Sequence, residues 1–399
     1  MNPVLALALA LAAGIAVTRL PLPHLRHSLS LDLVLAAGAP LVLVGLLLGP
    51  GLGVLDRTTL RALAPVTALG IGWIGAVFGA QLEWRLLRRI PRRVWALAAF
   101  QAAAVLVLTA LTAWLLTRAV PALAAAWRPT LPALLTLAAA ATISGPGAVA
   151  LVARAAGVRR SVARALGLAA MLDTAFGALA FTLALGLYHP RQPFAGAALG
   201  WAHWVAVAVA ASGGVGVLFL WLSRLRADLR ELGLDLLGVM LLGAGVGYAA
   251  DLSPFVVCAL ATALIVNLSP HKRRVQALLR AREDPIYAVL LILAGALLDL
   301  PTVWLLPAAV LLGAVRVAAR WAAVRHGREW LHVRDLPPNF GLATVAQGGV
   351  AVALGLSFNL IYAGAGTILT TVLLGVALAQ AISGPLMGLA LRPAPVEVK

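Results

Sequence analysis

The amino-acid sequence predicts an all-α polytopic membrane protein with about thirteen transmembrane helices. The first observation is composition: of 399 residues, 62% are hydrophobic and only 11% are charged, whereas an ordinary soluble domain carries roughly 25% charged residues. The second is spacing, because apolar stretches of about 20 residues, the length of a membrane-spanning helix, recur from Pro3 to Leu391. The third is that basic residues lie in short clusters between these stretches. Together these observations exclude a soluble fold.

The apolar stretches define the individual helices. We predict spans at residues 3–19, 31–49, 63–82, 94–117, 131–153, 162–187, 198–222, 231–249, 253–269, 285–299, 302–324, 341–361 and 366–391. Basic residues gather in the loops after odd-numbered spans, such as residues 85–93 and 272–282, and are few after even-numbered spans. Because Lys and Arg favour the cytoplasmic side, we expect the N-terminus outside and the C-terminus in the cytoplasm.

Charge and cysteine content exclude several functions. The net charge is +17, but apolar spans separate the basic clusters, so no single patch is available for nucleic acid. Cys258 is the only cysteine, which excludes an intramolecular disulfide and a cysteine-based metal site. The sequence lacks a Gly-rich phosphate loop with a lysine, so ATP hydrolysis is not expected. We predict neither an enzyme nor a bound cofactor.

Asp173 is the one carboxylate predicted to lie at the centre of a span. It follows the start of the 162–187 helix by about eleven residues, or roughly 16 Å. Ionisable groups at this depth are costly to bury and are usually functional. Burial favours a protonated carboxyl group and a nearby cation favours an ionised one, so such a site can exchange a proton for a metal ion. The alternative is a structural ion pair that holds helices together.

Two spans contain residues that interrupt a helix. In the fifth span Thr142 and Ser144 precede Gly145, Pro146 and Gly147. Proline and glycine there favour unwound backbone, which at membrane depth lines a cavity and binds ions; a simple kink is the alternative. The twelfth span contains Gln347, Gly348 and Gly349. Since the two spans are seven apart, they run antiparallel, which predicts an inverted repeat of spans 1–6 and 8–13 joined by span 7.

Arg316 and Arg320 lie four residues apart and share one face of the eleventh span. A buried arginine requires a carboxylate, carbonyl groups or water. We expect Arg316, the deeper of the two, to pair with Asp173. Arg320 has two interpretations: it extends to the cytoplasmic interface, or it is itself the buried charge partner.

Several segments resemble the cation:proton antiporter superfamily, in its sodium/proton and potassium/proton exchanger branches. They follow the family order along most of the chain. The segments that carry the resemblance are Gly45-Leu46-Leu47-Leu48-Gly49-Pro50, Gly79-Ala80-Gln81-Leu82-Glu83 followed by Arg88-Arg89, the Thr142 to Gly147 break followed by Asp173, Glu283-Asp284-Pro285, and Ala346-Gln347-Gly348-Gly349-Val350.

This resemblance implies a division of the chain. Core helices 4–6 and 11–13, at residues 94–190 and 301–399, would move like an elevator against scaffold and dimerisation helices 1–3 and 8–10, at residues 1–93 and 231–300. Residues 191–230 would form the linking helix, and the protein would be a homodimer. The chain departs from the family in one respect: Leu172 precedes Asp173 where the family has Asn, Asp or Gln. A register shifted by one residue would place Thr174 at the essential carboxylate position.

These observations lead to one main hypothesis and two alternatives. The main hypothesis is an antiporter of a prokaryotic plasma membrane that exchanges Na⁺ or K⁺ for H⁺. Asp173 would bind both, with Thr142, Ser144 and backbone carbonyls as further ligands, and with one-for-one exchange. The alternatives are an anion or organic-solute transporter that uses Arg316 and Arg320, and a non-transporting sensor or subunit whose site is locked by a permanent ion pair.

Overall fold

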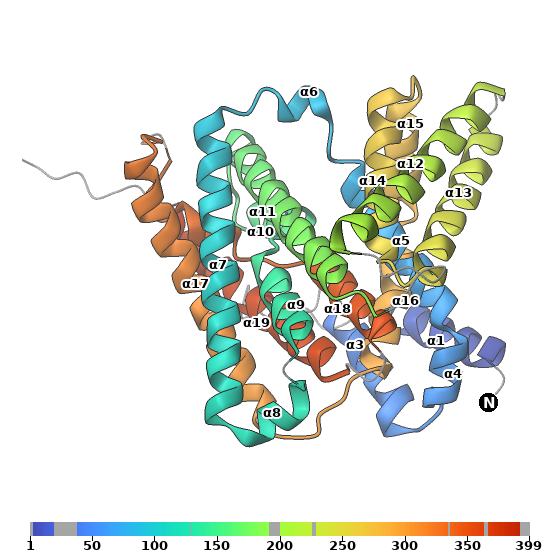
Figure 1. Ribbon diagram of the computed structural model, residues 1–399, viewed down its shortest axis with the longest axis horizontal. Coiled ribbons are helices and arrows are strands. Elements are labelled where there is room, and N and C mark those ends of the chain that lie inside the picture. Colours follow the sequence, from blue (N-terminus) through green and yellow to red (C-terminus); the bar gives the residue numbers. More distant parts are fainter. Residues whose placement is uncertain are drawn as a thin grey trace, which may run out of the picture.

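The computed structural model describes residues 3–19, 38–128, 130–190, 200–225, 229–333, 336–362 and 366–391. Throughout these residues the regular secondary structure is helical, with no strand (Figure 1). Seven helices are long and apolar enough to cross a membrane, and five further apolar helices are shorter. A helix satisfies its own backbone hydrogen bonds, which is what the hydrocarbon layer requires of a spanning segment. The predicted fold class is confirmed.

The helices follow one another in chain order. Up to the first broken helix they are α1 (Pro3–Arg19), α3 (Ala39–Leu46), the π-helical turn η1 (Leu47–Gly51), α4 (Arg57–Ala62), α5 (Ala64–Gly79), α6 (Trp84–Leu87), α7 (Arg92–Ala119), α8 (Pro121–Trp127), α9 (Leu131–Thr142) and α10 (Pro146–Ala155). The remainder are α11 (Arg160–Leu187), α12 (Trp201–Leu225), α13 (Leu229–Ala249), α14 (Pro254–Leu268), α15 (Lys272–Ala281), α16 (Glu283–Ala296), α17 (Leu305–Trp330), the 3₁₀ turn η2 (Phe340–Thr344), α18 (Gly349–Ile361) and α19 (Gly366–Ala390).

Each of the thirteen predicted spans corresponds to a helix or to a broken pair of helices, although residues 31–37 of the second span and 198–199 of the seventh lie outside the described residues. One basic connection between two predicted spans is itself helical. Residues 272–282, expected to be a loop, contain α15, whose Val275 and Leu279 are fully buried. These two residues lie four apart and therefore face the bundle together, while the basic side chains cover the other face.

Proline marks the first turn of many helices. It occupies one of the first two positions of α3, α5, α8, α9, α10 and α14. Its fixed backbone angle and missing N–H suit that position, where an N–H has no partner within the helix. The most important of these residues for the site is Pro146, which starts α10 in the middle of a predicted span.

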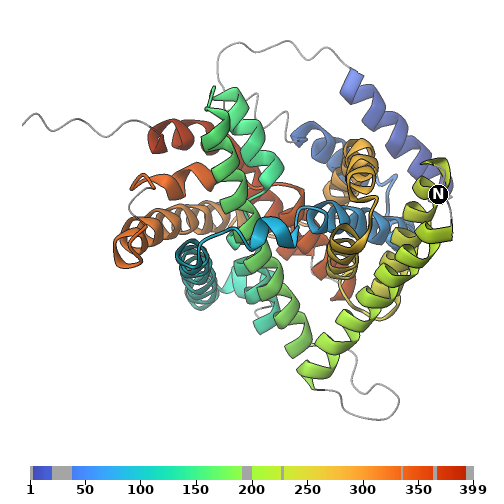
Figure 2. The same ribbon diagram turned by 90° about the horizontal axis from the view of Figure 1, so that it is seen from above.

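Glycines bring two pairs of helices into backbone contact. A Cβ on Gly75 or Gly79 of α5 would overlap the backbone of α14, and a Cβ on Gly49 would lie 2.7 Å from Ala296 of α16. Both views show α7 and α17 on one side of the molecule and α1 and α13 on the other (Figures 1 and 2). The short helices α6 and α8 lie at opposite ends of the bundle (Figure 1).

Candidate functional site

Two broken helices meet inside the bundle. The first is interrupted between Thr142, the last residue of α9, and Pro146, the first of α10; the second is interrupted between η2 and α18. The Gly145 N–H donates to the Ala346 carbonyl at 3.0 Å. A Cβ on Gly145 would lie only 2.7 Å from the backbone nitrogen of Gly348. Glycine is therefore required at the point where the two unwound segments cross. Both sequence-predicted interruptions are therefore present in the fold.

The two interruptions leave backbone carbonyls without helical partners, and Arg316 binds three of them. Its Nε donates to Ala141 at 2.6 Å, its Nη1 to Val345 at 2.7 Å and its Nη2 to Ile143 at 3.0 Å. Helix C-termini carry partial negative charge, and the helical segment before each interruption ends here. Arg316 thus places one positive charge between the two carbonyl-rich ends and joins them.

Neutral side chains satisfy further carbonyls in the same segments. The donor and acceptor pairs are Thr174 Oγ1 to Ser144 O at 2.6 Å, Gln347 Nε2 to Ala140 O at 2.7 Å, and Gln380 Nε2 to Gln347 O; the Ser144 hydroxyl also lies within hydrogen-bond distance of Thr344 O, at 2.6 Å. An unpaired backbone carbonyl inside a membrane protein costs several kcal/mol. These bonds from α11, α19 and the broken segments themselves explain how unwound backbone is stable at this depth.

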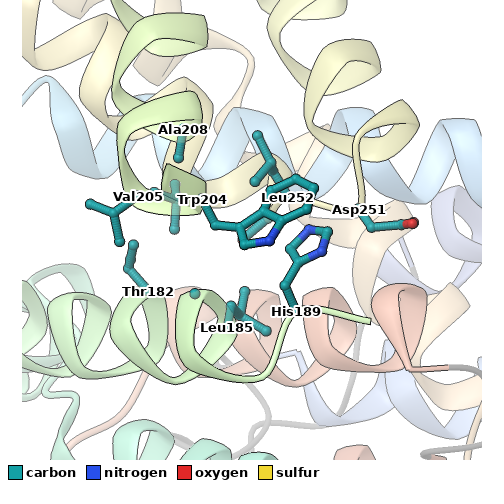
Figure 3. Close-up of a pocket in the computed structure, with 11 residues that line it drawn as sticks. Thr182, Leu185, His189, Trp204, Val205, Ala208, Asp251 and Leu252 are labelled. Carbon is teal, nitrogen blue, oxygen red and sulfur yellow. The ribbon is translucent and has the colours of Figure 1, made fainter. Parts of the chain in front are cut away.

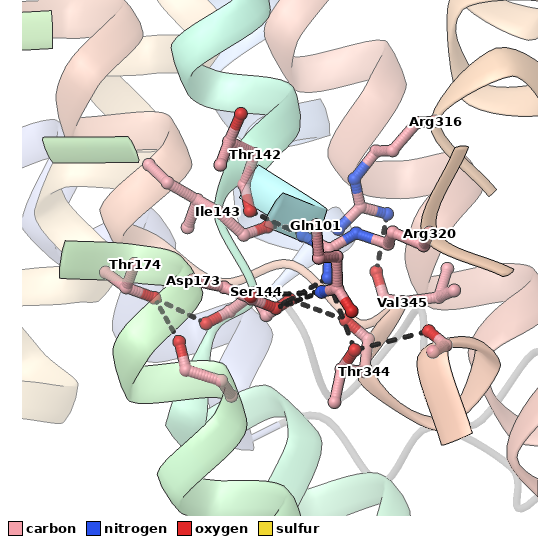
Figure 4. Close-up of polar contacts among 12 residues, drawn as sticks. Gln101, Thr142, Ile143, Ser144, Asp173, Thr174, Arg316, Arg320, Thr344 and Val345 are labelled. Carbon is pink, nitrogen blue, oxygen red and sulfur yellow. Dashed lines mark hydrogen bonds and ion pairs between the residues drawn. The ribbon is translucent and has the colours of Figure 1, made fainter. Parts of the chain in front are cut away.

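Asp173 of α11 lies beside this crossing and is 1% exposed. Its Oδ2 accepts from Arg320 Nη1 at 2.6 Å and from Ser144 Oγ at 2.9 Å. Gln101 Nε2 of α7 lies 3.0 Å from both carboxylate oxygens. Figure 4 shows these side chains converging on the carboxylate from α7, the first break and α17. The negative charge of Asp173 is stabilised by one positively charged side chain, Arg320, and by two neutral hydrogen-bond donors, Gln101 and Ser144.

The structure brings only some of the predicted ligands to Asp173. The Ser144 hydroxyl contacts it, as expected for a ligand. The Thr142 hydroxyl instead donates to Ala138 O at 2.9 Å, and the Thr174 hydroxyl lies within hydrogen-bond distance of the carbonyls of Ser144 and Ala170. Both threonine hydroxyls stabilise backbone rather than face the carboxylate.

The expected partner of Asp173 was the wrong arginine. Arg316 contacts backbone carbonyls, whereas Arg320 forms the ion pair and also donates to the Thr142 carbonyl and to Thr344 Oγ1. Arg320 is 0% exposed, so it does not extend to the interface. The four-residue spacing places each arginine on the same face of α17, but one turn apart, and only the second turn is level with Asp173.

Sequence reasoning missed Gln101, Thr344 and Gln380. The sequence signals for the site are ionisable groups and the residues around proline and glycine, and a neutral amide within a regular helix belongs to neither group. Gln101 nevertheless carries a recognisable signal, because it is the only amide in the apolar stretch from Val94 to Thr117. Polar side chains on membrane helices hydrogen-bond to neighbouring helices, and such a residue should have been a candidate.

The site offers oxygen ligands of the kind that hard cations take: the Asp173 carboxylate and the Ser144 hydroxyl. Within the described ranges no group of three or more His, Cys, Asp or Glu side chains forms a resident metal site. A cation at Asp173 would therefore be held by few charged ligands, which suits binding followed by release.

Two cavities lie elsewhere in the bundle. One of about 50 Å³ lies between α7, α9, α17 and α19 and reaches Arg316 and Gln347. The other, of about 20 Å³, lies between α11, α12 and the start of α14; in it His189 stacks on Trp204 with ring centroids 3.4 Å apart (Figure 3). The second cavity includes none of the residues around Asp173 and has space for about one water molecule.

Two solved structures of the sodium proton antiporter MjNhaP1 from Methanocaldococcus jannaschii are similar to this chain. The structure at pH 8 has a TM-score of 0.67 and 15% identity, and the comparison covers 98% of each chain. A structure from a three-dimensional EM map has a TM-score of 0.61 and 17% identity, again over 98% of each chain. The chain has the fold of this antiporter. No protein-family model and no curated protein matches the sequence, so the antiporter fold is established by structure, and its function must be argued from the site.

Proposed function

We propose that the protein is a secondary antiporter that exchanges a monovalent cation, Na⁺ or K⁺, for H⁺ at Asp173. The observation that carries this proposal is the fully buried Asp173–Arg320 pair beside two crossing broken helices. Such crossings expose backbone dipoles and carbonyls at the centre of a transporter. The similarity to a sodium proton antiporter over 98% of the chain supports the same assignment.

The competition between cation, proton and arginine follows from the contacts. With nothing bound, Arg320 balances the Asp173 charge at 2.6 Å. A proton neutralises the carboxylate, and a metal ion replaces the arginine as its counter-ion. Arg320 can withdraw without losing all its partners, because it also contacts the Thr142 carbonyl and Thr344 Oγ1. One carboxylate then carries one positive charge at a time, which gives electroneutral one-for-one exchange.

We further propose that the site helices move together as a core, with α1, α3, α5, α14 and α16 as part of the scaffold. Among the described residues, the hydrogen bonds to the Asp173 side chain come from α7, the first break and α17, within the predicted core. The backbone-tight pairs α5–α14 and α3–α16 lie within the predicted scaffold. One contact between the two groups is the Ser253–Ser357 hydroxyl pair at 3.0 Å, which sliding can break and re-form at small cost.

The proposed setting is a prokaryotic plasma membrane, with the N-terminus outside, the C-terminus in the cytoplasm, and a homodimer formed through scaffold helices. The basic loops support the orientation. The proposed dimer leaves the core free to move, since its contacts would not include the broken helices.

The geometry disfavours an anion or organic-solute transporter. Arg316 directs its Nε, Nη1 and Nη2 at carbonyls, and Arg320 is paired with Asp173. Neither arginine is therefore poised to receive an anion. A non-transporting protein with a locked ion pair is the remaining alternative, and transport itself distinguishes it.

The test is cation-dependent collapse of an imposed pH gradient in proteoliposomes that contain the purified protein. The wild type should collapse the gradient when Na⁺ or K⁺ is added. Asp173→Asn should insert and fold but be inactive, because the amide cannot carry the exchanged charge. Asp56→Asn is the matched control, since Asp56 caps α4 through Thr59 N and asparagine caps equally well. Full transport by Asp173→Asn, or none by the wild type, would refute the proposal.

A further inference from the structure

Among the residues that the structure describes, Gln101 is the one neutral side chain that hydrogen-bonds to both oxygens of Asp173. It lies on α7, is 6% exposed, and places Nε2 3.0 Å from Oδ1 and from Oδ2. For Oδ1 this amide is the only donor among the described residues, whereas Oδ2 also receives Ser144 and Arg320. The hydrogen bonding of Oδ1 within the described residues therefore depends on Gln101 alone.

In the described part of the chain, each hydrogen bond to the Asp173 carboxylate comes from a donor group, whereas a metal ion requires acceptors. The three donors differ in how they can change. Arg320 has no acceptor atom and must withdraw. The Ser144 hydroxyl can turn its proton toward the Thr344 carbonyl, 2.6 Å away, and present a lone pair from the same position.

The Gln101 amide carries both kinds of atom on one planar group. Rotation by half a turn about its terminal torsion, which is broad and roughly two-fold, exchanges the NH₂ group with the carbonyl oxygen. In the described part of the chain, Oε1 accepts no hydrogen bond. Rotation would thus break only the contacts to Asp173, and these are the contacts that cation binding removes in any case.

Resting on the proposed function, we infer that Gln101 is a specificity-determining ligand that alternates with the state of the site. Its NH₂ group donates to the ionised, cation-free Asp173, and its Oε1 ligates the alkali cation when Asp173 is loaded. Because the amide is neutral in both orientations, this ligand adds an oxygen without adding charge, and the exchange stays one-for-one. The amide position also limits the size of the cation that fits between α7 and α11.

The main test replaces the amide by a side chain of similar length. Gln101→Met should raise the KM for the cation about tenfold, the effect of losing one ligand interaction, and bring the Na⁺/K⁺ selectivity ratio closer to one. Its maximal rate should stay within about threefold of the wild type, since Asp173 still carries the charge. The pH profile should also move to higher pH, because a lost donor favours the protonated carboxyl.

Thr109→Val is the matched control. Thr109 is on the same helix, is 1% exposed, and makes no contact with Asp173. If Gln101→Met has the KM and selectivity of Thr109→Val, the inference is wrong. A fall in maximal rate with unchanged KM and selectivity would assign Gln101 to packing alone and also overturn it.

A second variant tests the neutrality of the ligand. Gln101→Glu retains an oxygen but adds a carboxylate, so more than one proton should leave per cation, and the exchange rate should respond to an imposed membrane potential. The wild type should not respond. If Gln101→Met fails to insert, potential-independent exchange by Gln101→Glu overturns the inference. Failure of the proposed function is distinct, because wild type and Thr109→Val would then both be inactive.

Discussion

Arg316 and Arg320 lie one turn apart on α17, and the structure predicts opposite consequences of losing them. Arg316→Met removes the donor from three carbonyls, those of Ala141, Ile143 and Val345. An unsatisfied buried acceptor costs about 1–3 kcal/mol, so the three together cost about 3–9 kcal/mol. This is comparable to the whole stability of an ordinary domain, about 5–15 kcal/mol. Arg316→Met should therefore unfold at a much lower temperature.

Arg320→Met leaves a buried carboxylate without its cation. Removing one member of a buried pair costs about 3–5 kcal/mol, but Asp173 can relieve this cost by taking up a proton. The variant should remain folded at neutral pH, and its exchange profile should move to higher pH, because protonation is no longer opposed by the arginine charge. The altered pH profile, rather than altered stability, is the diagnostic result for Arg320.

The assay heats detergent-purified variants, measures the fraction that remains monodisperse, and records exchange against pH in a single lipid. Arg325→Met is the control, since Arg325 is an exposed residue on the same helix. The reasoning fails if Arg316→Met is as heat-stable as Arg325→Met. It fails equally if the pH profile moves in the Arg316 variant and not in the Arg320 variant.

Three other predictions follow from contacts outside the arginine pair. Gly145→Ala should destabilise the protein and reduce exchange, because its Cβ would lie 2.7 Å from Gly348 N. Gly147→Ala should be neutral, because a Cβ there would have no atom within 4 Å. Equal melting temperatures of the two variants would contradict this prediction. Hydrogen bonds from Lys272 and Gln276 lower the pKa of Glu83. The wild type should therefore melt at a higher temperature than Glu83→Gln above about pH 5, and this difference should shrink as acid protonates Glu83. A difference that persists in strong acid would refute this prediction. Mass measurement in lipid should find a homodimer, and monomers that exchange normally would exclude one.

The sequence was sufficient to predict the apolar spans and the two interruptions at the site, because both depend on local chemistry. Apolar length determines a span, and Pro146 with its flanking glycines determines a break. The choice between Arg316 and Arg320 could not be made in this way. It depends on the height of α17 relative to α11, which is fixed by packing between residues more than a hundred positions apart. For the same reason the sequence marks Gln101 as a polar residue in an apolar span but does not reveal that it contacts Asp173, 72 residues away.

Leu172 stands where the family resemblance implies a polar residue, but the polar contacts to Asp173 come from other segments of the fold. The resemblance to the antiporter superfamily implies a polar residue before the aspartate, and Leu172 departs from it. In the structure Leu172 is 1% exposed and belongs to the apolar core. The polar contacts come instead from Gln101 on α7 and Ser144 in the first break. Since both are neutral, Asp173 remains the only acidic group among the contacts described at the crossing. If the protein exchanges cations for protons as proposed, that single charge is the physical reason to expect one proton per cation.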